Sequence, residues 1–191
     1  MDNLIERDDL SFRLMQDDVG DYDLMSKWLT DPRVLEFYEG RDSPLSREEV
    51  AKRYAPRILR SEGVTPCFLL HRGTAIGYLQ YDPITEETRA SYGLSDEDIA
   101  DTYGMDLFIG EPDCWGQGIG TQAVSLFLEY LFEIRAARKV VIDPHVDNFR
   151  AIRCYEKCGF RCVKLLPKHE FHEGEYQDSW LMELDVSAWR G

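Results

Sequence analysis

The stretch from Tyr103 to Thr121 constrains this chain more than any other. It reads as an apolar strand, a turn with glycine at every second position (Gly116, Gly118 and Gly120), and a helical pattern from Gln122 to Ile134. Such glycines let backbone N–H groups approach a ligand closely, and the N-terminus of the following helix carries a partial positive charge. The pattern predicts a phosphate-binding turn, with an ordinary strand-to-helix connection as the alternative.

Length and composition limit the class of protein. The chain has 191 residues and is 43% hydrophobic, which predicts one globular domain over residues 1–191. No apolar run approaches the roughly 20 residues of a membrane span and no signal-peptide core is visible, so we expect a cytoplasmic protein. Five cysteines without paired C-x-x-C spacing predict reduced thiols and no metal site. The 22 basic and 36 acidic residues give a net charge of -14, which disfavours nucleic acid and anionic membranes and attracts cations.

Hydrophobic periodicity predicts an α+β chain. Strands are expected at 10–14, 67–71, 75–81, 103–109, 139–142, 160–166 and 180–184, and helices at 21–29, 46–59, 121–134 and 148–157. Asp21 is the expected cap of the first helix, Ser46 to Glu49 has capping-box spacing at the start of the second, and Asp147 or Asn148 is the expected cap of the last. An acidic connection (82–101) and a charged, histidine-bearing loop (167–178) separate these elements. Parallel crossovers fall only in the second half, which rules out a regular doubly wound fold. The inward residues of the third helix are expected to be Val124, Phe127, Leu128, Leu131 and Ile134.

This order of elements, with a glycine turn after the fourth strand, resembles the GNAT superfamily of N-acetyltransferases. The phosphate-loop pattern of that superfamily, R/Q-x-x-G-x-G/A, falls on Trp115 to Gly120, with Trp at the first position. A second signature, N-x-x-A-x-x-x-Y-x-x-x-G-F, falls on Asn148 to Phe160. The resemblance implies a GNAT acyltransferase fold of the α+β class. We expect a mixed, mostly antiparallel sheet of about seven strands flanked by about four helices, splayed between strands 4 and 5 (103–109 and 139–142).

Within the superfamily the chain is similar to the aminoglycoside 6′-N-acetyltransferases from about Leu10 to Glu183. It is most similar to the acetyltransferase half of a bifunctional acetyltransferase and phosphotransferase resistance enzyme. The similarity rests on segments 28–38, 76–80, 103–112, 143–145 and 169–174. It implies transfer of an acetyl group from acetyl-CoA to the 6′-amine of an aminoglycoside antibiotic, which would confer resistance.

The resemblance also implies where acetyl-CoA binds. The backbone amides of 116–121 are expected to hold the pyrophosphate, and the strand edge at 107–109 the pantetheine arm. The implied cofactor-binding residues are Leu107, Phe108, Ile109, Trp115, Gly116, Gln117, Gly118, Ile119, Gly120, Thr121, Asn148, Ala151 and Tyr155.

The catalytic residues that the resemblance implies are Asp106 and Tyr155. An unpaired carboxylate in a core costs several kcal/mol and strands disfavour Asp, so Asp106 indicates a functional role. Two roles are open for it, either a general base or an anion that orients the attacking amine. An ordinary Asp pKa of about 3.9 makes a poor base, which favours orientation with assisted deprotonation. Coenzyme A leaves as a thiolate with a pKa of about 8.5, and Tyr155 is the expected proton donor. A tyrosine packed on the core is the alternative.

A polycationic substrate requires several carboxylates around it. The residues expected to bind substrate are Tyr38, Glu39, Gln80, Asp106, Asp143, Glu173 and Asp178, with further acids at 86–87 and 96–98. Gln80 and Asp143 match substrate-contacting positions of the family, whereas each of the other acids alone reads as a solvated charge. Tyr38 and Tyr92 are candidates for stacking on sugars or for the core. His145, His169 and His172 are interpreted as loop residues because no spacing completes a zinc set.

Two alternatives stay open at this point. One keeps the fold and changes the acceptor to a protein N-terminus, a polyamine or another metabolite amine. The other is a non-catalytic CoA-binding module, which the Trp at the first position of the phosphate turn leaves open. We expect a small cationic substrate as the partner, and a monomer or weak homodimer.

Overall fold

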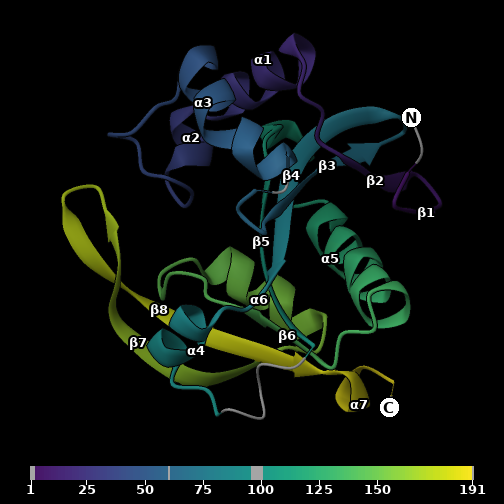
Figure 1. The fold of residues 1–191 in the computed structure, drawn as a ribbon, viewed down its shortest axis with the longest axis vertical. Helices are drawn as coiled ribbons and strands as arrows, with labels where there is room; N and C mark the ends of the chain where they lie inside the picture. The colour runs from purple at the N-terminus through teal and green to yellow at the C-terminus, as the bar shows by residue number, and fades with distance from the viewer. Residues whose placement is uncertain (1–2, 60, 96–100, 191) are drawn as a thin grey trace. The chain divides into compact units, whose positions relative to one another are not determined.

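The computed structural model describes residues 3–59, 61–95 and 101–190. Among them, eight strands form one mixed sheet in the order β1-β2-β3-β4-β5-β6-β8-β7 (Figure 1). The strands are β1 (Ile5–Arg7), β2 (Leu10–Leu14), β3 (Thr65–His71), β4 (Thr74–Pro83), β5 (Thr102–Ile109), β6 (Lys139–Ile142), β7 (Arg161–His172) and β8 (Glu175–Asp185). The α-helices are α1 (Val19–Trp28), α2 (Pro32–Leu35), α3 (Arg47–Ile58), α4 (Glu86–Tyr92), α5 (Ile119–Glu129), α6 (Phe149–Lys157) and α7 (Val186–Trp189), with the 3-10 helix η2 (Pro112–Cys114) and the π-helix η3 (Tyr130–Ile134).

The predicted α+β class is confirmed, with antiparallel pairs β1–β2, β2–β3, β6–β8 and β7–β8 and the parallel pair β5–β6. The described residues form eight strands and seven α-helices, compared with the expected seven or so strands and four or so helices. The three-residue strand β1 is too short to give a period, and α2, α4 and α7 have only four to seven residues. Helix α4 lies inside the segment 82–101, which was expected to be a plain connection. The acids at 96–98 lie outside the described residues.

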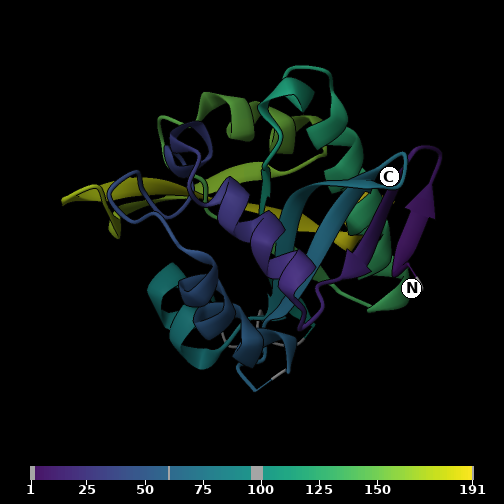
Figure 2. The ribbon, with the colours of Figure 1, turned by 90° about the horizontal axis from the view of Figure 1, so that it is seen from above.

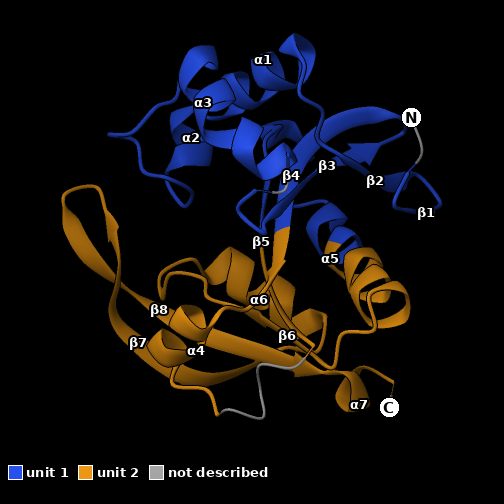
Figure 3. Cartoon of the chain, viewed as in Figure 1, with its two compact units in different colours: residues 1–80, 106–123 blue, residues 81–105, 124–191 orange. Residues whose placement is uncertain are grey.

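The chain divides into two compact units (Figure 3). Unit 1 comprises residues 1–80 and 106–123, and unit 2 comprises residues 81–105 and 124–191. Within the described residues, no helix is both long enough and apolar enough to cross a lipid bilayer. All five cysteines carry thiols rather than disulfides, as their spacing predicts.

Side-chain caps fix the helices of unit 1. Helix α3 begins with the predicted capping box, in which the Ser46 side chain accepts from the Glu49 N–H and the Glu49 carboxylate accepts from the Ser46 N–H at 2.8 Å. The prediction that Asp21 caps α1 is wrong, because Asp18 takes that place. Asp21 instead lies buried in the first turn and receives both guanidinium ends of Arg13, at 2.6 and 2.7 Å. A buried carboxylate is stable only when it is paired in this way.

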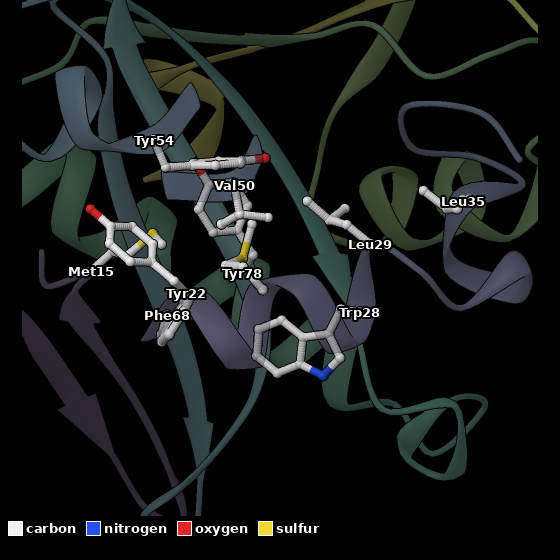
Figure 4. Close-up of a cluster of buried hydrophobic side chains, with 10 residues drawn as sticks. Met15, Tyr22, Trp28, Leu29, Leu35, Val50, Tyr54, Phe68 and Tyr78 are labelled. Carbon is white, nitrogen blue, oxygen red and sulfur yellow. The ribbon is translucent and has the colours of Figure 1, made fainter. Parts of the chain in front are cut away.

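The core of unit 1 is largely aromatic (Figure 4). Trp28, Tyr54 and Tyr78 are fully buried, and the Trp28 ring meets Phe68 edge-on with centroids 5.4 Å apart. The indole N–H of Trp28 donates to Glu111 Oε1 at 2.9 Å, which satisfies its polar atom. Helix α3 packs against both α1 and β3. The cluster therefore fixes the helices of this unit on its strands.

Unit 2 contains the parallel ladder of the sheet. Its pairs run from Thr102↔Lys139 to Gly104↔Val141, and β5 continues to Ile109 beyond the last of them, in agreement with the expected splay. Helix α6 begins at the cap Asn148, one of the two residues predicted for it. The helix ends before Gly159, whose φ of 97° lies in the left-handed region.

Two predictions about unit 2 are wrong. Residues 167–178 are not a loop: β7 and β8 continue through them and turn at Glu173 and Gly174, which makes one long hairpin (Figures 1 and 2). Ile134 is 59% exposed although Val124, Phe127, Leu128 and Leu131 are buried. The reason is the π-helical turn of η3, where the Arg135 N–H donates to the Tyr130 carbonyl at 3.0 Å. A π-helical turn is wider than an α-helical one, so it rotates Ile134 out of line with the buried face of α5.

Gly77 permits the close approach of β4 and β5 in unit 1, and its replacement should destabilise the fold. A Cβ atom at Gly77 would clash with the backbone carbonyl oxygen of Phe108, which cannot rotate away. We expect Gly77→Ala to lower the free energy of unfolding by about 1–3 kcal/mol. Gly104→Ala is the matched control, since a Cβ there meets nothing within 4 Å. Urea unfolding of both variants checks the prediction, and equal stabilities would contradict it.

Candidate active site

Asp106 lies on the part of β5 that belongs to unit 1, where its half-buried carboxylate is held by a side chain of β4. Gln80 Nε2 donates to Asp106 Oδ2 at 2.8 Å. The carbonyl oxygen of the same amide accepts from Arg57 Nη1 at 2.8 Å and from the Tyr78 hydroxyl at 3.0 Å. The structure thus brings together Gln80 and Asp106, two of the residues predicted to bind substrate. Arg57 was missed, although it falls three residues after Tyr54 on the inward stripe of α3.

Three aromatic rings pack together in this part of unit 1, and one of them, Tyr38, is close enough to feel the charge of Asp106. Tyr38 is half-buried and its ring centroid lies 4.6 Å from that of Phe108, which in turn lies 5.7 Å from Tyr78. Burial raises the pKa of Tyr38 well above its usual range, and the nearby Tyr54, Tyr78 and Asp106 add to the rise. The Tyr38 hydroxyl is therefore neutral at physiological pH. Glu39 follows in a left-handed conformation and forms an ion pair with Arg53 of α3.

The glycine turn lies in unit 1 between η2 and α5. Gly116 and Gly118 have φ of 73° and 79°, a conformation that favours glycine, and with Gln117 they are exposed. Trp115 donates its indole N–H to the Ile109 carbonyl at 2.8 Å, which ties the turn to the end of β5. The first N–H groups of α5, beginning at Ile119, have no acceptors within the helix itself. This geometry presents exposed amides next to a helix N-terminus.

Helix α6 of unit 2 carries the second predicted motif. The Asn148 side chain accepts from the Ala151 N–H at 3.1 Å, so it serves first as the helix cap. Tyr155 is 6% exposed, and its ring meets Phe160 edge-on with centroids 5.9 Å apart. The ring is thus packed among buried residues, which fits the core-packed alternative, and the role of Tyr155 as a proton donor stays a prediction.

Unit 2 also pairs two histidines with carboxylates. His169 Nε2 lies 2.8 Å from Asp143 Oδ2, and His145 Nε2 lies 2.9 Å from Glu170 Oε2. The hydrogen bond to Asp143 raises the pKa of His169 against the opposing effect of burial, and Glu170 does the same for His145. The interpretation as loop residues is wrong for His169 and His172, whereas His145 does lie in the connection between β6 and α6. His145 and His172 are buried and stack edge-on at 4.8 Å, and His169 and His172 lie on β7.

Of the remaining predicted acids, Glu173 and Asp178 lie at the hairpin of β7 and β8, and Glu86 and Glu87 lie in the first turn of α4. Asp178 accepts from the Lys168 N–H at 2.8 Å, and Glu173 occupies the turn with a φ of 51°. Tyr92 of α4 packs its ring against His169, with centroids 5.7 Å apart. Among the residues that the structure describes, no three metal-ligating side chains are grouped so as to hold an ion.

Comparisons of the sequence and of the structure with known proteins agree on one family. An acetyltransferase (GNAT) domain model matches residues 17–167. The chain is 32% identical over 158 residues to aminoglycoside N(6')-acetyltransferase type 1 of Klebsiella pneumoniae, covering 80% of this chain and 74% of the relative. It matches the structure of AAC(6')-Ib in complex with ribostamycin and coenzyme A with a TM-score of 0.77 and 28% identity, over 96% of this chain and 97% of that one. Spermidine N-acetyltransferase from Vibrio cholerae, bound to CoA and spermine, shares the fold at 20% identity, with a TM-score of 0.77 over 96% and 99% of the two chains.

The pairing of Asp143 with His169 predicts a specific change on mutation. We expect Asp143→Asn to lower the pKa of His169 towards the ordinary value of 6.5, because the neutral amide no longer favours the imidazolium. A histidine with a raised pKa stabilises the fold fully below its unfolded pKa, and this contribution is lost as the pH rises through the folded value. The variant should therefore lose most stability at acidic pH.

Titration of the imidazole protons by NMR checks this expectation. His145 is the internal comparison: Glu170 is the main cause of its raised pKa and Asp143 only a lesser one, so its pKa should fall less than that of His169. Unchanged titration of His169 in the variant would contradict the assignment.

Proposed function

Since this chain belongs to the GNAT acetyltransferase family and is an acetyl-CoA-dependent N-acetyltransferase, we propose that its acceptor is the 6′-amine of an aminoglycoside antibiotic. The observation that carries the proposal is the 32% identity to an aminoglycoside N(6')-acetyltransferase over 80% of this chain. The net charge of -14 supports it, since an acidic protein attracts a polycation. Acetylation replaces an ammonium of the drug by a neutral amide and so weakens its binding to ribosomal RNA.

The glycine turn suits the pyrophosphate of acetyl-CoA. Gly116 and Gly118 expose their backbone next to the N-terminus of α5, where peptide dipoles favour an anion. Trp115 replaces the Arg or Gln of the family pattern and supports the turn through Ile109. We assign the pyrophosphate to the amides of residues 116–121 and the pantetheine arm to the edge of β5 at residues 107–109. Ala151 and Asn148 complete the cofactor-binding set that we propose.

Asp106 is the proposed residue that holds the acceptor amine. Its carboxylate attracts the ammonium, orients it and assists its deprotonation, after which the nitrogen attacks the thioester carbonyl. The new C–N bond forms and the C–S bond breaks, with the electron pair leaving on sulfur. Tyr155 is the proposed donor of the proton that this sulfur takes up. The nitrogen loses two protons as the ammonium becomes an amide: one leaves to solvent, and the other restores the Tyr155 hydroxyl through solvent.

Carboxylates and aromatic rings would recognise the rest of the drug. Asp143, Glu173 and Asp178 of unit 2 are the proposed partners of further ammonium groups, and Glu39 of unit 1 is another. Gln80 and Tyr38 offer an amide and a ring edge to the sugar. Each of these polar groups discriminates against a substrate that leaves it unpaired.

We further propose that residues 1–191 make one GNAT domain, since the family match from 17 to 167 includes residues of both compact units. The reduced state of all five cysteines supports a cytoplasmic location. A monomer or a weak homodimer is the proposed form.

The choice of acceptor is tested with purified protein, acetyl-CoA and a panel of amines. With kanamycin as the acceptor, acetyl-CoA should release its thiol. With spermidine or a peptide with a free N-terminus, thiol release should be far lower. A kanamycin analogue with a hydroxyl in place of the 6′-amine is the matched control and should stay unmodified. Mass spectrometry locates the acetyl group. Release only with spermidine or peptide would overturn the aminoglycoside proposal, and binding of acetyl-CoA without release would indicate a non-catalytic module.

Asp106→Asn should reduce kcat by about a hundredfold or more, because loss of a general base or orienting anion typically costs 10²–10⁴ in rate. Acetyl-CoA affinity, measured by calorimetry, should change little, since the cofactor is assigned to other residues. An unchanged kcat in a folded variant would remove Asp106 from the chemistry.

A further inference from the structure

A chain of hydrogen bonds in unit 1 leads from helix α3 to the Asp106 carboxylate. Arg57 Nη1 donates to Gln80 Oε1 at 2.8 Å, and Gln80 Nε2 donates to Asp106 Oδ2 at 2.8 Å. The Tyr78 hydroxyl donates to the same Gln80 oxygen at 3.0 Å. Arg57 and Asp106 therefore act on opposite ends of one amide group.

Arg57 determines which way that amide faces. A guanidinium has only donors, so it can meet the oxygen of Gln80 but not its NH₂ group. If the amide were flipped, its NH₂ would face the guanidinium without an acceptor, and its oxygen would face the Asp106 carboxylate. Both contacts would be repulsive. Tyr78 alone cannot enforce the choice, because a hydroxyl both donates and accepts.

The guanidinium is itself held in place. Its Cζ lies 5.1 Å from the centroid of the Tyr54 ring, and Tyr54 is fully buried. Its Nε lies 3.6 Å from Glu62 Oε2, and the side chain of Arg57 is only 22% exposed. The Tyr54 ring and the low exposure of the side chain leave the guanidinium little room to follow the amide if Gln80 rotates.

We propose that Arg57 is a positioning residue for catalysis. It locks the amide of Gln80 so that Nε2 always donates to Asp106, which fixes the rotation of the carboxylate that receives the amine. This inference rests on the proposed role of Asp106. Arg57 acts through Gln80 and does not touch the reacting atoms.

The test compares two replacements of similar length, Arg57→Met and Arg57→Lys, with kanamycin as the acceptor. We expect Arg57→Met to lower kcat about tenfold and to leave the KM for acetyl-CoA within about twofold. Arg57→Lys should recover most of the activity, because an ammonium also donates without accepting. Gln80→Glu is a second variant: it keeps a partner for Arg57 but cannot donate to Asp106, and it should lose more activity than Arg57→Met.

A double-mutant cycle separates positioning from a structural role. In a Gln80→Met background, adding Arg57→Met should change kcat by less than about twofold, because the route from Arg57 to Asp106 is already broken. Arg47→Ala is the control on the same helix: its exposed ion pair with Asp23, at 3.3 Å, is outside the site, and the variant should keep full activity. Thermal unfolding verifies that each variant is folded.

The outcomes distinguish this inference from the proposed function. Independent, multiplicative effects of Arg57→Met and Gln80→Met in an enzyme that Asp106→Asn inactivates would overturn the positioning role alone. Equal activities of Arg57→Lys and Arg57→Met would overturn it as well. A wild-type protein that acetylates only another amine would overturn the aminoglycoside proposal, and the same cycle would then be measured with that amine.

Discussion

The negative charge of a carboxylate in the middle of a strand needs hydrogen-bond partners, and a network of polar side chains in unit 1 supplies them to Asp106. Asp106 is half-buried on β5, where an uncompensated charge would cost several kcal/mol. The hydrogen bond from Gln80, at 2.8 Å, contributes to this compensation and is supported by Arg57 and Tyr78 behind it. Each buried polar group that lacks a hydrogen-bond partner costs free energy, as the Nε of Arg57 does within the described part of the chain, and this restricts the residues that can stand at each position.

Close backbone packing makes this network possible. Gly77 lets β4 approach the carbonyl of Phe108, and Gly110 leaves room for the Trp28 ring. The Gly110 N–H donates to the Ile76 carbonyl at 2.8 Å, so the two segments remain tied where β5 ends. The glycines of unit 1 therefore do two different things: those beside the aromatic cluster permit contact, and those of the turn at 116–118 expose backbone. Strand β5 connects the two groups, because Gly77 approaches its residue Phe108 and Trp115 of the turn donates to its last residue, Ile109.

The sequence predicts the elements with a strong local signal and misses what depends on distant partners. The capping box at Ser46 and the buried run at 139–142 could be located because each is a pattern within a few neighbouring residues. The extension of β7 could not, because Lys168 and Glu170 read as loop residues, whereas a ribbon needs only backbone pairing with β8. The motif residues of the site were found by resemblance. Arg57 and His169 were not assigned their partners, because these lie 23 and 26 residues away in the chain.

The pairing of Asp143 with His169 has a consequence for how a cation would bind there. In the free protein this carboxylate already faces an imidazole whose pKa it raises. An ammonium that takes over Asp143 removes the main cause of the raised pKa, so binding of the ammonium and protonation of His169 oppose each other. To the extent that the imidazole carries a proton, binding at this carboxylate exchanges one positive charge for another. The net charge of the complex then changes by less than the charge of the ligand, and the affinity of the site is coupled to the proton concentration around it.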